Sequence, residues 1–165
     1  MEIIDEDLVE ETWKEVAAFT TKLINKEMQN VGKEQPALLA FIVEFTEELD
    51  QEVKELAIYM FFNVYRMFKK GFGKKIKPIS TDEIMECYES NENLMQSLEG
   101  AHDKFYDRIA RIQVSGQPFI MKYVLETLFE PPEVEDSIEL TDEDTGFLFL
   151  LLKTVVDILN NKTDA

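Results

Sequence analysis

Cys87 and His102 are the residues whose types could support nucleophilic catalysis, because a thiolate beside an imidazole base is a common catalytic pair. The chain has one cysteine and one histidine. On one helix, their separation would place them about 22 Å apart, whereas a nucleophile needs its base within about 3 Å. Zinc needs about three or four protein ligands, commonly His and Cys. We therefore expect neither a Cys-His enzyme nor a zinc site.

Three short stretches resemble parts of cofactor sites. Residues 99–102 have the Glu-x-x-His spacing of half a di-iron site, which requires a second copy. A calcium loop starting at Asp142 would have Phe147 in place of its glycine and Lys153 in place of its final glutamate. Residues 71–75 lack the spacing of a phosphate-binding loop. We expect no cofactor.

Carboxylates spaced three residues apart offer one further catalytic option, a divalent-metal-dependent phosphohydrolase of the all-helical type. The two rows are Glu83, Glu86, Glu89, Glu92 and Glu52, Glu55. Each step of three residues turns about 60° around a helix, which carries the first row away from the apolar side and favours a solvated face. We expect a non-enzymatic protein and keep the phosphohydrolase as the alternative.

Four polar residues fall on otherwise apolar helix faces: Thr20, Glu27, Asn91 and His102. Buried polar side chains need partners, so these residues form a candidate buried polar cluster. Antiparallel packing would bring Thr20 to His102 and Glu27 towards Asn91; parallel packing would bring Glu27 near His102. Satisfied core residues, or a frayed helix end at Glu27, are the simpler interpretation. The placement also suggests that His102 tunes stability or ligand binding with pH.

A basic cluster gathers six of the 17 basic residues within 12 positions: Arg66, Lys69, Lys70, Lys74, Lys75 and Lys77. It could bind an anion or an acidic partner. It could equally favour a helix C-terminus and neutralise the acidic stretch 130–144.

The net charge of −17 would repel nucleic-acid phosphates and anionic membranes, so we expect no direct binding to either. Mimicry of nucleic-acid charge is a weaker option. The longest apolar runs, near residues 56–65 and 147–156, are about half the length that crosses a bilayer. One cysteine excludes an internal disulfide, and the first residues lack the pattern of a secretory signal, which together favour the cytoplasm.

The elements that must position these residues are all helical. Apolar residues at intervals of three and four predict an all-α, single-domain six-helix bundle spanning residues 1–165. The predicted helices are 6–31, 36–49, 50–70, one of roughly 30 residues from about 81 that Gly100 could split, 118–129, and one beginning at Thr141. Apolar residues surround 50–70 and the last helix on nearly all sides, so these two should be central.

The stretches QPALLAFIVE and QPFIMKYVLE begin at Gln35 and Gln117. Each is preceded by a long amphipathic helix and followed by a central helix, so residues 6–70 and 81–161 are a candidate internal repeat. Chance similarity between helices remains the alternative. Without a catalytic signature, the function cannot be read from the sequence. We expect protein–protein interaction, as an adaptor, chaperone-like or regulatory protein that binds another protein or itself.

Overall fold

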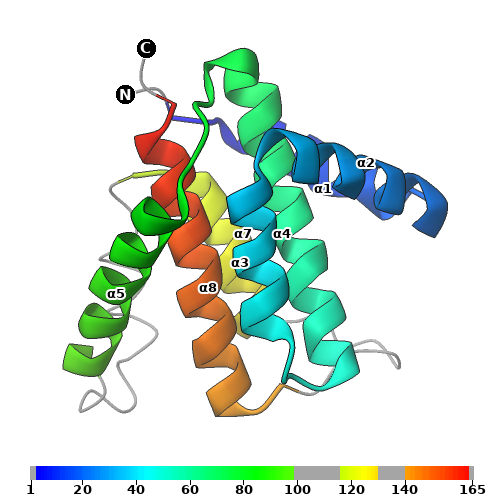
Figure 1. The fold of residues 1–165 in the computed structure, drawn as a ribbon. Helices are drawn as coiled ribbons and strands as arrows, with labels where there is room; N and C mark the ends of the chain where they lie inside the picture. Colours follow the sequence, from blue (N-terminus) through cyan, green and yellow to red (C-terminus); the bar gives the residue numbers. More distant parts are fainter. Residues whose placement is uncertain (1–2, 99–115, 130–139, 164–165) are drawn as a thin grey trace.

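The computed structural model describes residues 3–98, 116–129 and 140–163, and these residues are helical without any strand. The all-α prediction is confirmed (Figure 1). The helices are α1 (Glu6–Ala17), α2 (Thr21–Glu34), α3 (Pro36–Thr46), α4 (Gln51–Phe72), the short 3-10 helix η1 (Gly73–Lys75), α5 (Thr81–Leu98), α7 (Pro118–Phe129) and α8 (Asp142–Asn161). No helix in these ranges is long and apolar enough to cross a membrane.

The predicted first helix, 6–31, is instead two helices, α1 and α2, which corrects the expected count of six in the part of the chain that is described. The break lies at residues 18–20. The Thr20 side chain accepts a hydrogen bond from the Leu23 backbone N–H at 3.1 Å and so caps α2. Phe19 turns inward, with its ring centroid 6.4 Å from that of Phe62. A new cap and a new aromatic contact thus compensate for the interrupted helix.

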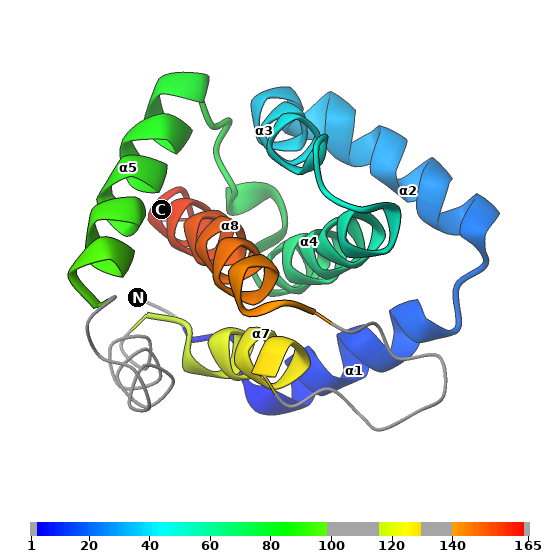
Figure 2. The ribbon, with the colours of Figure 1, turned by 90° about the horizontal axis from the view of Figure 1, so that it is seen from below.

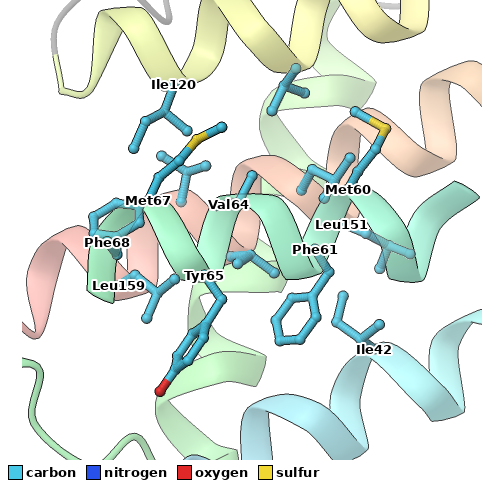
Figure 3. Packing of buried hydrophobic residues seen from close by; sticks show 14 of the residues in the cluster. Ile42, Met60, Phe61, Val64, Tyr65, Met67, Phe68, Ile120, Leu151 and Leu159 are labelled. Atoms are coloured by element: carbon cyan, nitrogen blue, oxygen red, sulfur yellow. The ribbon is translucent and has the colours of Figure 1, made fainter. Parts of the chain in front are cut away.

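The central helices are α4 and α8, as predicted, and they pack against each other. Residues 148–156 and 158–160 of α8 are buried, which leaves this helix almost no solvent-exposed side. Figure 3 shows Phe61, Met67 and Phe68 of α4 packed among side chains from the neighbouring helices. Burial of each such side chain contributes about 1.5–3 kcal/mol, so these two helices anchor the fold.

The other helices surround this pair (Figure 2). α1 packs on α4 and α5 packs on α8, while α3 and α7 each cover the central helix that follows it in sequence. Two further contacts cross between the halves of the chain: α1 meets α7, and α3 meets α5. α2 lies outermost and has Val31 as its buried residue. The helices α1, α3, α5 and α7 thus each contact elements from both halves of the chain.

Gln35 and Gln117, the first residues of the two Gln-Pro stretches, are buried and hold the start of a helix in the other half. The side-chain oxygen Oε1 of Gln35 accepts a hydrogen bond from the Ile79 backbone N–H at 3.0 Å. The side-chain nitrogen Nε2 of Gln35 donates to the Lys77 backbone carbonyl at 3.0 Å. The side-chain oxygen Oε1 of Gln117 accepts a hydrogen bond from the Ile4 backbone N–H at 2.9 Å. We call these two sets of contacts the glutamine clamps.

The two residues that the clamps hold, Ile4 and Ile79, occupy the same position relative to the helix that follows each of them. Ile4 directly precedes Asp5, the N-cap of α1, whose carboxylate accepts from the Leu8 backbone N–H at 2.8 Å. Ile79 directly precedes Ser80, which exchanges hydrogen bonds with Glu83 in the predicted capping box. The glutamine that opens α3 therefore fixes the start of α5, and the glutamine that opens α7 fixes the start of α1.

Candidate functional site

Asn91 is the member of the predicted polar cluster that the structure places in a buried network. Its partners come from α8. The Lys153 ammonium donates to Asn91 Oδ1 at 2.6 Å and also pairs with Asp157, while the Asn91 amide donates to Thr154 Oγ1 at 3.2 Å. Lys153 and Asn91 are 7% and 4% exposed. We call Asn91, Lys153, Thr154 and Asp157 the α5–α8 polar network.

The expected partners of Asn91 are not those observed. Thr20 is exposed, because it is the N-cap of α2 and lies at the turn rather than on a buried face. Glu27 is partly exposed on the outer helix α2. His102 lies outside the described residues, so its proposed role in pH sensing stays a prediction. A polar residue on an apolar face is thus a helix N-cap at Thr20 and part of an interhelical hydrogen-bond network at Asn91.

Cys87 borders the α5–α8 polar network without forming a nucleophile. Its burial, and secondarily the Asp157 charge, raises the pKa of the thiol to about 11, while Lys153 acts in the opposite sense. The thiol is therefore protonated at neutral pH and a weak nucleophile. Beside it, between α5 and α8, is a polar hollow of about 610 Å³ whose rim carries the Glu83–Lys162 ion pair. Cys87 is unpaired with any other cysteine.

The basic cluster is divided between ion-paired and exposed residues. Arg66 and Lys70 pair with Glu15 of α1, and Lys69 pairs with Glu34 of α2 at 3.1 Å. Lys74, Lys75 and Lys77 are exposed on η1 and the segment after it. Half of the cluster is thus neutralised by carboxylates of α1 and α2. It serves to fasten these outer helices to α4.

We expect the Glu15 contacts to make stability depend on pH. Lys70, and next Arg66, hold the pKa of the Glu15 carboxyl below its ordinary value by hydrogen bonding. A lowered folded-state pKa adds stability above the unfolded value of about 4.3, and this stability is lost as pH falls through the folded-state value. Glu15→Gln should lower the free energy of unfolding by about 0.5–1 kcal/mol at pH 7 and by less at pH 3. Urea denaturation at both pH values measures the difference.

The control is Glu11→Gln on the same helix, because Glu11 is exposed and has no ion pair among the described residues. It should change stability little at either pH. Equal effects of the two substitutions at pH 7 would contradict the assignment to Glu15.

A groove of about 490 Å³ runs between α1 and α7, and we call it the α1–α7 groove. Figure 2 shows these two helices next to each other, although they are distant in sequence. The apolar part of its lining consists of Val9, Trp13, Phe119 and the ring of Tyr123. Trp13, the single tryptophan, is 39% exposed. A large, partly exposed aromatic side chain in a concave site is typical of interaction surfaces.

Charged side chains border the α1–α7 groove. Glu6 and Glu10 project from α1, and Lys122 and Glu126 from α7. Lys122 Nζ is 3.5 Å from Glu6 and 4.0 Å from Glu126, and all three side chains are about half exposed. Burial, and secondarily Tyr59, raises the pKa of Tyr123, so its phenol is neutral at physiological pH. The groove therefore has an uncharged floor and a mostly acidic rim.

The corresponding helix pair on the other side, α3 and α5, is filled. Tyr88 of α5 lies against Phe41 and Phe45 of α3, with ring centroids 5.9 and 4.9 Å away. When the two Gln-Pro stretches are superposed, Phe41 falls on Tyr123 and Phe45 falls on Thr127. Trp13 likewise follows Ile4 by the same number of residues, nine, as Tyr88 follows Ile79. Thr127, which lines the open α1–α7 groove, therefore has the sequence position that Phe45 has in the filled pair.

Sequence reasoning missed this groove because the spacing of Val9, Trp13 and Val16 predicts one apolar helix face and does not show which element packs against it. The signal was present one residue after the two Gln-Pro stretches, where Phe45 and Thr127 differ although each follows an aromatic residue by four. Among the described residues, no group of three or more His, Cys, Asp or Glu side chains could hold a metal ion. No family model, curated protein or solved structure matches this chain.

Proposed function

We propose that the protein binds another protein, as an adaptor, chaperone-like or regulatory factor, and that the α1–α7 groove is the binding surface. The observation that carries this proposal is the contrast between two similar helix pairs. Phe45 fills the space beside Tyr88, whereas the smaller Thr127 lines an open groove in which Trp13 is 39% exposed. An exposed aromatic side chain in a groove costs solvation free energy that a partner would recover on binding.

The binding surface is better suited to a different protein than to a second copy of this chain. At a net charge of −17, two copies repel each other, and the acidic rim would face the same acidic surface. Self-association through this groove is therefore disfavoured.

We also propose that residues 6–70 and 81–161 are two copies of one three-helix unit. The glutamine clamps support this, because each Gln-Pro stretch holds the residue before the first helix of the other unit. The crossed contacts α1 with α7 and α3 with α5 follow the same exchange. On this basis the α1–α7 groove is where the two copies differ in sequence, with Thr127 in one and Phe45 in the other.

The alternative, a carboxylate-based phosphohydrolase, has no comparable support in the described residues. Glu86 and Glu89 are exposed on α5, and Glu83 is occupied by Lys162 and Ser80. The phosphohydrolase also requires several inward-facing carboxylates around one point, so we do not favour it.

The test of the proposed function is Thr127→Phe, which places a ring where Phe45 stands in the filled helix pair. Tagged wild-type protein, Thr127→Phe and the control Thr127→Ser are used to capture partners from the native cells. We expect a partner that is retained by wild type and Thr127→Ser and lost with Thr127→Phe. Trp13 emission should shift to shorter wavelength in Thr127→Phe, which verifies that the groove is filled.

Equal recovery of every partner by Thr127→Phe and wild type, with the groove verified as filled, would overturn the proposal. Light scattering of the purified protein checks the oligomeric state, and a dimer that Thr127→Phe dissociates would replace the separate partner with a second copy.

A further inference from the structure

We propose that the α1–α7 groove binds a basic peptide segment of the partner, anchored by one bulky apolar side chain. This inference rests on the protein-binding function proposed above and specifies the chemistry of the partner. It is argued from the charge of the rim, the weakness of the ion pairs within it, and the size and nature of the floor.

The rim attracts cations. Its three carboxylates, those of Glu6, Glu10 and Glu126, exceed the two ammoniums beside them by one charge, since Lys122 lies in the rim and Lys14 pairs with Glu10 at 2.8 Å. The whole chain carries −17, so the field around the groove is not reversed by its surroundings. A groove of one sign concentrates ligands of the opposite sign and speeds their association.

The ion pairs of the rim can be exchanged. Lys122 is 3.5 Å from Glu6 and 4.0 Å from Glu126, and the side chains are 52–54% exposed. Exposed pairs of this kind contribute little to stability. An arginine or lysine of a partner can therefore bind Glu6 or Glu126 without the loss of a strong internal contact.

The floor accepts an apolar anchor. Val9 is 4% exposed and forms the bottom, with Phe119, Tyr123 and Trp13 around it. A volume of about 490 Å³ accommodates one or two large side chains rather than a whole helix. The Lys14 ammonium already lies 5.8 Å from the centroid of the Trp13 ring, so this ring is also placed to interact with cations.

The charge of this chain argues against its own neighbouring segment as the occupant. Residues 130–139, which follow α7, carry five carboxylates and no basic residue. Such a sequence is repelled by the acidic rim for the same reason that a basic sequence is attracted. A basic segment is therefore the fitting ligand.

The experiment uses the full chain and two synthetic peptides of equal length, one with a phenylalanine flanked by lysines and arginines, the other with the basic residues replaced by glutamates. Neither contains tryptophan, so the emission of Trp13 reports binding. We expect the basic peptide to change Trp13 emission in a saturable way, with an affinity that falls as salt rises. The acidic peptide should not bind.

Matched charge reversals separate the groove from general charge attraction. Glu126→Lys changes the groove rim, and Glu44→Lys changes the corresponding exposed residue of α3 by the same amount. We expect Glu126→Lys to weaken the basic peptide about five- to tenfold and Glu44→Lys less than twofold. Thr127→Phe should remove binding.

Three results would overturn the inference: no binding of the basic peptide, equal weakening by Glu126→Lys and Glu44→Lys, or preference for the acidic peptide. The proposed function fails by a different result, namely capture of all partners by Thr127→Phe. If a captured partner is sensitive to Thr127→Phe but not to Glu126→Lys, protein binding at the groove stands and the basic class of ligand is wrong.

Discussion

Substituting methionine for Gln117 is expected to lower the free energy of unfolding by about 2–4 kcal/mol, and for Gln35 by about 2–3 kcal/mol. Methionine has a similar volume, so packing is largely preserved while the hydrogen bonds are lost. In Gln117→Met, the buried Ile4 N–H loses its acceptor, and the Asn160 side-chain oxygen loses the Gln117 donor at 3.0 Å. In Gln35→Met, the Ile79 N–H loses its acceptor and the Lys77 carbonyl loses its donor.

The control is Gln51→Met, because Gln51 is exposed and bonds only its helical neighbour Glu55 in the described contacts. It should change stability by less than about 0.5 kcal/mol. Urea denaturation measures all three variants, and thermal midpoints should fall by about 2–4 °C for each kcal/mol lost. If Gln117→Met and Gln51→Met were equally stable, the glutamine clamps would be incidental contacts.

Asp157→Asn is the second substitution with a large expected effect, a loss of about 2–4 kcal/mol. It removes the charge that pairs with the buried Lys153 ammonium and leaves Asn91 Oδ1 as the neutral acceptor among the groups described. The value is set below that of a fully enclosed ion pair because the Asp157 side chain is 34% exposed. Chemical denaturation at pH 7 measures the change.

Lys153→Met gives the contrasting result. It removes the buried charge itself and Asp157 can remain hydrated, but the buried Asn91 Oδ1 loses its donor, so we expect a loss of about 1–2 kcal/mol, smaller than that of Asp157→Asn. The double variant Lys153→Met/Asp157→Asn should resemble Lys153→Met, because Asp157 then has no buried cation to neutralise. A double variant as unstable as Asp157→Asn alone would show that Asp157 contributes through another contact.

Local chemistry explains which features could be predicted. The Ser80–Glu83 capping box and the prolines that begin α3 and α7 depend on a few neighbouring residues, and all three helix starts are observed where the sequence indicates them. The central positions of α4 and α8 follow from apolar residues on all sides, which no exposed helix could tolerate.

Features that depend on contacts distant in sequence were not predicted. Periodicity alone could not distinguish one helix from two in phase, so the break at Thr20 was missed, although a threonine before an apolar run is also an N-cap signal. In the sequence, Lys153 entered the argument only as a mismatch to a calcium loop, because its partners Asn91 and Asp157 are identified by the packing of α5 on α8. The α1–α7 groove required knowing which helix faces Thr127.

The glutamine clamps also bear on how the chain folds during synthesis. Ile4 leaves the ribosome well before its hydrogen-bond acceptor, which belongs to Gln117 and is synthesised 113 residues later. The N-terminal half therefore cannot complete the start of α1 while it is the only part synthesised. Completion of each half waits for the other, which favours a late, concerted folding step over stepwise folding from the N-terminus.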